Sequence, residues 1–341
     1  MNQAGSLGPE TEHYVTCFDH RFLLQGLALH ESLRRHHPGS FLWVLALDDA
    51  VATQLRQLRR SRLAVLPLPS VESPRLKAAK KNRSWAEYIY TLTPFTFDLV
   101  FGEDASVRRL TYVDADLCFF QSPAGLFGDL ERQGGGILIT EHGYAPEHRG
   151  LEQEFGRFCV QFLTVNRDPG SLGVVRRWQM QCLESCSTAH AQRGRVYGDQ
   201  KYLDHWPENH RDVVRIAAGV PELLGPWNVD HYQRRAGRKY WPVFYHFHSF
   251  RIFRPGWIQL CAGYNPRRAG HLYSAYLHLL RRLDEKLGAS GIARPFIPFA
   301  GDRWWLPRLG WRVATGRASV RRWPAVSPAF PAEPSPDFLS M

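Results

Sequence analysis

The alternation of apolar strands with amphipathic helices, through about residue 215, most constrains the fold. Segment 41–47 is continuously apolar, as in a strand buried on both faces. Segment 22–37 has helical spacing and ends before Pro38-Gly39. Further strands are expected at 14–18, 62–68, 109–113, 136–140 and 162–165, and further helices at 50–60, 172–186 and after Ser84, which can form a capping box with Glu87. The pattern predicts an α/β fold whose mainly parallel sheet carries helices on both faces.

Length and charge set broad limits. The 341 residues predict one large α/β domain or two smaller ones. The net charge of +11, from 43 Lys and Arg against 32 Asp and Glu, fits anionic partners. Charge alone does not choose among nucleotide phosphates, acidic lipids and nucleic acid.

The six cysteines form no Cys-x-x-Cys pair, which argues against a structural zinc site. Several stand in apolar stretches and are expected to be buried thiols, as in a reducing compartment. The N-terminus lacks a signal-peptide pattern, and the chain has no apolar run of about 18 residues. These features predict a cytoplasmic protein, with peripheral contact to the inner membrane left open.

The segment Arg109-Leu-Thr-Tyr-Val-Asp114-Ala-Asp116 runs from an apolar strand into two carboxylates. In an extended chain Asp114 and Asp116 point to the same side, where they repel each other unless a cation lies between them. A divalent metal held by one or two carboxylates typically completes its shell with substrate phosphates. The alternative is a solvated turn after the strand.

Other acidic residues also follow expected strands. Parallel sheets bind ligands beyond the carboxyl ends of their strands. Three segments are expected at such strand ends: 16–19, Asp48-Asp49 and 114–116. Asp19, Asp48 and Asp49 are candidates for base or ribose contacts, with caps and turns as the alternative.

Two histidines and a basic cluster carry weaker signals. His246 and His248 share one face if 243–250 is extended, as metal ligands or as a hydrogen-bonded core pair. Lys80, Lys81 and Arg83 precede a helix start and either reach phosphates or form a solvated cluster.

Several of these segments, in order, resemble a known family. The chain is similar to bacterial GT-A glycosyltransferases of the nucleotide-diphospho-sugar transferase superfamily, and most to the retaining branch with glycogenin and the lipopolysaccharide galactosyltransferases (family 8-like). The resemblance spans about residues 13–255 and rests on segments 14–33, 110–120, 198–203 (Gly-Asp-Gln-Lys-Tyr-Leu), 226–229 (Pro-Trp-Asn-Val) and 245–249 (Tyr-His-Phe-His-Ser).

The resemblance implies a GT-A type, Rossmann-like mixed sheet and transfer of a sugar from a nucleotide-diphosphate sugar to an acceptor. A retaining mechanism, a role in polysaccharide biosynthesis, and a cell-surface glycan or lipid-linked sugar as acceptor are expected. It implies Mn²⁺ or Mg²⁺ held by Asp114, Asp116 and His246, with His248 as the spare. Asp199 and Gln200 would be catalytic, although Asp199 also suits a helix N-cap. Donor contacts would come from Thr16, Phe18, Asp19, Arg83, Asp114 and Arg251.

Two segments depart from the family pattern. Segment 158–161 (Phe-Cys-Val-Gln) stands where the family has Asn-x-Gly, which leaves the sugar open. Segment 254–257 (Arg-Pro-Gly-Trp) replaces a Lys-Pro-Trp, so Arg251 or Arg254 would take the diphosphate role.

The expected organisation is a flexible leader at 1–12, the transferase domain at 13–286, a Trp- and Arg-rich extension at 287–324 and a disordered tail at 325–341. The extension either lies on an anionic membrane or packs back on the domain.

Two other function classes fit parts of the sequence. A phosphohydrolase can use Asp-x-Asp as nucleophile and acid, but Leu117-Cys118 follow here and about a hundred residues of α/β pattern precede. A catalytically silent binding protein is opposed by the retained Asp pair, Asp199 and His246. No RNA-reading aromatic motif is present, so nucleic acid is not an expected partner.

Overall fold

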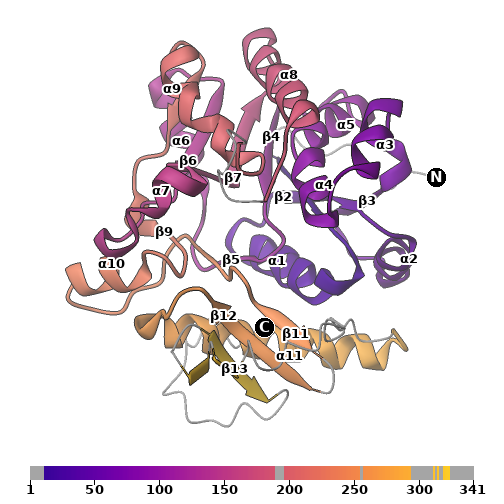
Figure 1. Ribbon diagram of the computed structural model, residues 1–341. Helices are drawn as coiled ribbons and strands as arrows, with labels where there is room; N and C mark the ends of the chain where they lie inside the picture. Colours follow the sequence, from indigo (N-terminus) through magenta and orange to yellow (C-terminus); the bar gives the residue numbers. More distant parts are fainter. Residues whose placement is uncertain are drawn as a thin grey trace.

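The computed structural model describes residues 11–188, 196–253, 256–292, 310–311, 313–314 and 318–322. A seven-stranded sheet in the order β3-β2-β1-β4-β7-β6-β8 forms the centre (Figure 1). β7 is antiparallel to both of its neighbours, while the remaining neighbours pair in parallel. The expected α/β fold with a mixed, mainly parallel sheet is confirmed.

The elements of this sheet follow the expected alternation. The strands are β1 Glu12–Phe18, β2 Ser40–Ala46, β3 Leu63–Pro67, β4 Arg109–Val113, β6 Ile137–Glu141, β7 Phe158–Asn166 and β8 Val214–Ile216. The longer helices around it are α1 Leu23–His36, α2 Asp49–Leu58, α3 Pro74–Lys81, α4 Trp85–Leu92, α5 Phe95–Glu103, α6 Ala124–Gln133 and α8 Pro169–Glu184. The shorter helices are α7 Leu151–Phe155, α9 Trp206–Asn209 and α10 Val229–Arg235.

The central strands are buried on both faces. Along β1, Tyr14 packs in the core that includes α1, whereas its neighbour Val15 packs in the core that includes α4, α5 and α8. Successive side chains of a strand point to opposite faces, so one apolar strand supplies both cores. The seven residues of β2 are all buried, as its continuous apolar sequence predicts.

The capping prediction is confirmed at the start of α4. The Ser84 hydroxyl accepts from the backbone N–H of Glu87, and the Glu87 carboxylate accepts from the backbone N–H of Ser84. The strand expected at 162–165 is longer than predicted, because β7 begins at Phe158.

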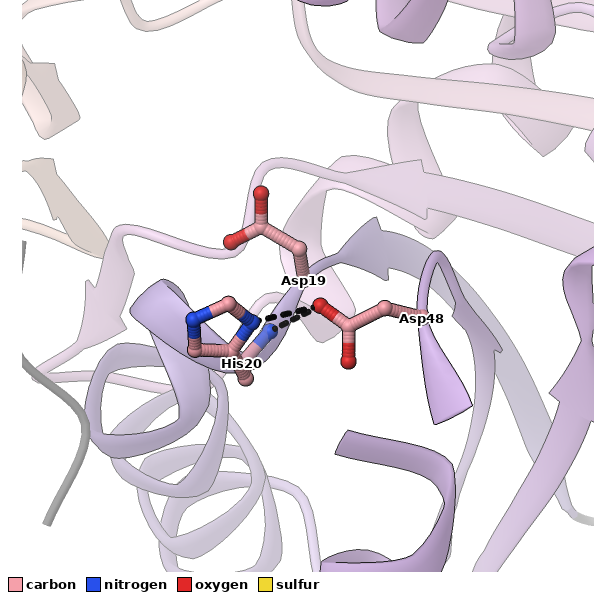
Figure 2. A group of neighbouring side chains, drawn as sticks. All are labelled: Asp19, His20 and Asp48. Carbon is pink, nitrogen blue, oxygen red and sulfur yellow. Dashed lines mark hydrogen bonds and ion pairs between the residues drawn. The ribbon is translucent and has the colours of Figure 1, made fainter. Parts of the chain in front are cut away.

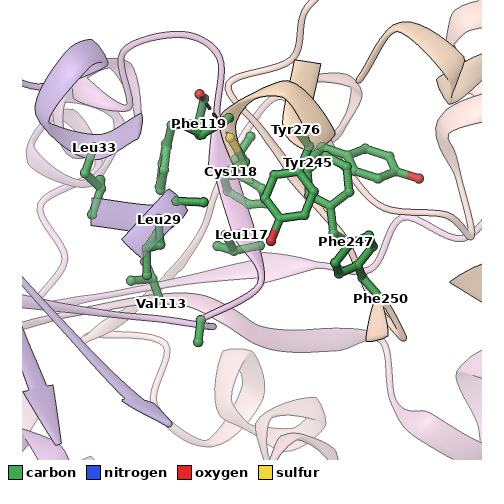
Figure 3. Packing of buried hydrophobic residues seen from close by; sticks show 14 of the residues in the cluster. Leu29, Leu33, Val113, Leu117, Cys118, Phe119, Tyr245, Phe247, Phe250 and Tyr276 are labelled. Carbon is green, nitrogen blue, oxygen red and sulfur yellow. Dashed lines mark hydrogen bonds between the residues drawn. The ribbon is translucent and has the colours of Figure 1, made fainter. Parts of the chain in front are cut away.

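A second layer covers one edge of this domain. A three-stranded sheet in the order β5-β10-β9 is built from Leu117–Phe119, Phe244–His246 and Leu223–Leu224. Its side chains meet α1 and the long helix α11 (Gly270–Ala289), and Figure 3 shows the rings of Phe119, Tyr245, Phe247 and Tyr276 gathered there. The Phe247 and Tyr276 rings stack with centroids 3.8 Å apart.

The third sheet, β11-β12-β13, comprises Arg251–Phe253, Trp257–Ala262 and Ala318–Arg322. β13 pairs antiparallel with β12, so this part of the predicted extension packs back on the domain. α11 continues to Ala289, past the boundary predicted at residue 286. The predicted leader at 1–12 is too long by one residue, because β1 begins at Glu12. Residues 1–10, the Trp-rich segment 302–308, Arg254 and the tail at 325–341 lie outside the described residues.

Two further expectations concern the cysteines and the membrane. All six cysteines are buried, and no disulfide joins them. Within the described ranges, no helix is long and apolar enough to cross a membrane.

Candidate functional site

Asp114 and Asp116 follow β4 at its carboxyl end. The expectation that an extended chain brings them together is wrong, because Ala115 and Asp116 form a turn, with the Leu117 amide donating to the Asp114 carbonyl across 3.1 Å. The turn still brings both carboxylates near one imidazole, that of His246. The Asp114 side chain is 31% exposed, so the site is accessible from outside.

His246 ends β10, which pairs antiparallel with β5 so that His246 lies opposite Leu117. Its Nε2 lies 3.1 Å from the Asp116 carboxylate and 3.8 Å from that of Asp114. One ligand atom from each of the three residues lies within 4.8 Å of the others. The structure thus brings together the three predicted metal ligands.

His248 does not share a strand face with His246, because β10 ends at His246 and Ser249 has a left-handed backbone with φ of 62°. The centroids of the two imidazole rings are 5.6 Å apart, and His248 is exposed. His246 is therefore the better placed of the two predicted alternatives.

Gln161, on β7, orients His246. Its side-chain oxygen lies 2.8 Å from His246 Nδ1, so Nδ1 donates this hydrogen bond and Nε2 is left to face the two carboxylates. A metal-binding histidine usually donates its second ring N–H to such an acceptor. No local pattern in the sequence indicates this role for Gln161, because the role depends on β7 pairing beside Asp114, whose amide donates to the Gln161 carbonyl.

The charges of the three ligands are strongly shifted. Burial, aided by Asp116, raises the pKa of Asp114 to about 6. Burial would also raise the pKa of Asp116, but His246, with Arg251 and His248, outweighs it and lowers that pKa to about 2. Burial alone would lower the pKa of His246. The negative charge of Asp116 has the larger effect and raises the His246 pKa well above its usual value. A proton on the imidazole thus offsets the carboxylate charge.

Trp227 forms the wall beside His246. Its ring lies edge-on to the His246 ring at 5.4 Å, and its indole N–H donates to the His142 carbonyl across 2.7 Å. Asn228 donates to the same carbonyl across 2.9 Å. The 226–229 segment that carried part of the resemblance therefore fixes the position of an aromatic ring against the predicted metal ligand.

Asp199 is buried, at the N-cap position of the short helix Gln200–His205. Burial first, and the charge of Asp114 second, raise the pKa of Asp199 to about 7. The side-chain amide of Gln200 donates to the Phe155 carbonyl across 2.8 Å. Asp199 is thus close enough to Asp114 for their charges to interact, while Gln200 is tied to the end of α7.

The predicted donor contacts fall into different environments. Asp19 is buried and accepts from Trp85 Nε1 at 3.0 Å and Arg21 Nε at 2.9 Å. The Arg251 guanidinium donates to the Phe250 carbonyl across 2.7 Å and lies over the Phe22 ring, near enough to Asp116 and Asp19 for their charges to act on its pKa. Thr16 is fully buried, and its hydroxyl has no partner among the described residues.

Phe18 belongs to the core. It is 3% exposed, and a Cβ added at Gly26 of α1 would lie 2.3 Å from its Cζ. Gly26 therefore allows the helix to approach the Phe18 ring. The predicted donor contact of Phe18 stays a prediction, and with the ring buried such a contact would fall to its backbone.

Arg83 is hydrogen-bonded away from the cluster. Its guanidinium donates to the carbonyls of Cys182 and Leu183 at the end of α8, at 2.6 Å each, and to the Thr91 hydroxyl. Lys80 pairs with Glu72 at 2.8 Å. The predicted phosphate contact of Arg83 would require these bonds to break.

A second cluster consists of Asp19, His20 and Asp48 (Figure 2). His20 Nδ1 lies 2.7 Å from Asp48, whose other oxygen caps α2 by accepting from Val51. Asp19 is held by Arg21 and Trp85. Bonds within the protein thus account for these side chains, and the capping alternative is confirmed for Asp48.

Two uncharacterized proteins of Bacillus subtilis (strain 168) resemble the chain in sequence. YfnD is 27% identical over 299 residues, which cover 84% of this chain and 95% of that protein. YfnF is 28% identical over 258 residues, which cover 71% of this chain and 82% of that protein. No family model matches the sequence.

Solved glycosyltransferases resemble the chain in structure. The galactosyltransferase LgtC, crystallised with donor and acceptor sugar analogs, aligns with a TM-score of 0.51 at 15% identity, over 82% of this chain and 99% of LgtC. Mouse xyloside xylosyltransferase 1 aligns with a TM-score of 0.44 at 14% identity, over 70% of this chain and 98% of that protein. The chain has the GT-A type fold, as its resemblance to that superfamily predicted.

Proposed function

We propose that this protein is a metal-dependent glycosyltransferase that moves a sugar from a nucleotide-diphosphate sugar to an acceptor. The observation that carries the proposal is the convergence of Asp114, Asp116 and His246 at the carboxyl end of β4 in a GT-A type fold. Ligands of open α/β sheets bind at this end of the strands.

The residues fit a divalent cation. Two carboxylates and one imidazole suit Mn²⁺, and Mg²⁺ is the alternative. The bond from His246 Nδ1 to Gln161 directs Nε2 toward both carboxylates. When bound, the cation would neutralise charge on the diphosphate leaving group.

The surrounding residues have separate proposed roles. Arg251 would pair with the diphosphate, since it already interacts with Asp116 and Asp19. Asp19 and Thr16 would contact the nucleoside. Asp199 would stabilise the positive charge that develops on the sugar, and Gln200 would position sugar or acceptor hydroxyls. A retaining outcome and a glycan or glycolipid acceptor are part of the proposal.

Metal-dependent donor hydrolysis tests the reaction class. Purified protein is incubated with Mn²⁺ and a panel of UDP-, GDP- and dTDP-sugars, and nucleotide release is followed. We expect release from one donor, loss of release with EDTA, and loss in Asp116→Ala. Asp212→Asn, which removes an exposed carboxylate, serves as the matched control and should behave as wild type. Equal nucleotide binding by wild type and Asp116→Ala, without hydrolysis, would contradict the proposal.

A further inference from the structure

A large basic groove lies away from the metal-ligand cluster. Its volume is about 1480 Å³, and it runs between the C-terminal halves of α1 and α11, which lie side by side (Figure 1). Residues 238–241, together with Leu58, Arg60 and Ser61, also line this groove, which is called the α1–α11 groove below. Its volume exceeds the ordinary range for small-molecule sites, which favours an extended occupant.

The groove is strongly cationic. Seven Lys and Arg side chains line it, against one carboxylate, Glu31. Glu31 is paired with Arg60 at 2.8 Å, and its charge also acts on Lys286 and Arg282, so the lining carries one negative charge against seven positive ones. Burial lowers the pKa of His30 and of His36 to about 4, so these two histidines are neutral at pH 7.

The same groove also has an apolar part. Phe120, Tyr240 and Trp241 line it, and the Phe120 and Trp241 rings are 5.2 Å apart. Cations around aromatic rings match the boundary of a bilayer, where Trp and Tyr settle among headgroups and anionic lipids attract Lys and Arg.

We propose that the α1–α11 groove docks the protein on an anionic phospholipid surface. Charge complementarity selects an anionic partner, and the aromatic residues favour an amphiphile over a purely soluble ion. The docking does not depend on the proposed transferase activity.

The groove and the metal-ligand cluster lie at opposite ends of one strand pair. β5 leaves Asp116 and reaches Phe120, whose amide donates to the Val243 carbonyl just before β10, the strand that ends at His246. Four residues of strand span about 13 Å at about 3.3 Å each. If the α1–α11 groove contacts the membrane, the metal-ligand cluster would therefore lie within about 13 Å of the lipid headgroups.

Vesicle flotation tests the docking. The variant Arg34→Gln/Arg238→Gln/Lys239→Gln/Lys286→Gln removes four exposed groove cations. The control Arg149→Gln/Arg176→Gln/Arg177→Gln/Arg211→Gln removes four exposed cations from other surfaces. Vesicles contain either phosphatidylcholine alone or phosphatidylcholine with phosphatidylglycerol.

We expect wild type and control to float with the vesicles that contain phosphatidylglycerol and not with those of phosphatidylcholine alone. The groove variant should bind the anionic vesicles at least tenfold more weakly. Each Lys or Arg near an anionic membrane surface contributes about 1 kcal/mol, which is about fivefold in affinity. A tenfold loss for four cations is therefore a lower bound. Unchanged melting temperatures establish that both variants fold. Equal losses in both variants, or no vesicle binding by wild type, would overturn the proposal. Groove-dependent binding of heparin or RNA without vesicle binding would also overturn it and assign a soluble polyanion.

Discussion

The side-chain oxygen of Gln161 accepts a hydrogen bond from Nδ1 of His246 across 2.8 Å, joining β7 to β10 through side chains 85 positions apart. Because this bond fixes the tautomer and the ring orientation, it determines which nitrogen of His246 faces Asp116.

Gln161→Met should weaken Mn²⁺ binding by about 10- to 100-fold, because it removes the acceptor that orients His246. Isothermal titration calorimetry measures the effect directly. Gln161→Glu keeps an acceptor at this position and should retain most of the affinity. Equal affinity of Gln161→Met and wild type would mean that the hydrogen bond does not position the ligand.

Mn²⁺ binding should release protons. Asp116 raises the pKa of His246 well above its usual value, so the metal-free imidazole is protonated at pH 7 and must lose its proton to bind a metal. The pKa of Asp114, about 6, adds to the dependence at lower pH. Affinity should therefore rise with pH, by about tenfold per unit for each proton released. Calorimetry in buffers of different ionisation enthalpy counts the protons, and a pH-independent affinity would contradict this prediction.

Asp199→Asn should lower the rate of sugar transfer by at least about 100-fold, if its carboxylate stabilises charge at the reacting carbon. The wild-type rate should increase as pH rises through about 7, because burial and Asp114 raise the Asp199 pKa to that value and the ionised form is the active one. The rate profile of Asp199→Asn should lack this inflection. An unchanged inflection would assign it to another group.

Arg83→Ala should destabilise the fold by about 2 kcal/mol, because it leaves two carbonyls at the end of α8 without their charged donor. Urea unfolding measures this loss. Donor KM separates the two proposed roles of Arg83: an unchanged KM supports the structural role, while a KM raised more than tenfold would support the phosphate contact.

The sequence predicted the strand-helix alternation well because β2 and α1 have strong local patterns. It predicted Asp114 and Asp116 for a partly incorrect reason, since a turn rather than an extended strand brings them together. The positions of Gln161 and Trp227 depend on β7 running antiparallel beside β4 and on side-chain contacts between distant segments. Neither leaves a local pattern in the chain. The burial of the Phe18 ring against Gly26 could not be predicted either, because the close approach of α1 depends on packing.

His246, the last of the three cluster residues, stands on β10, which lies between β5 and β9 and is synthesised well after the Asp114–Asp116 turn. A nascent chain that has not yet emerged beyond residue 246 contains the Asp114–Asp116 turn but not the imidazole that completes the cluster. Premature termination or slow folding of the C-terminal layer would therefore leave a product unable to assemble this cluster.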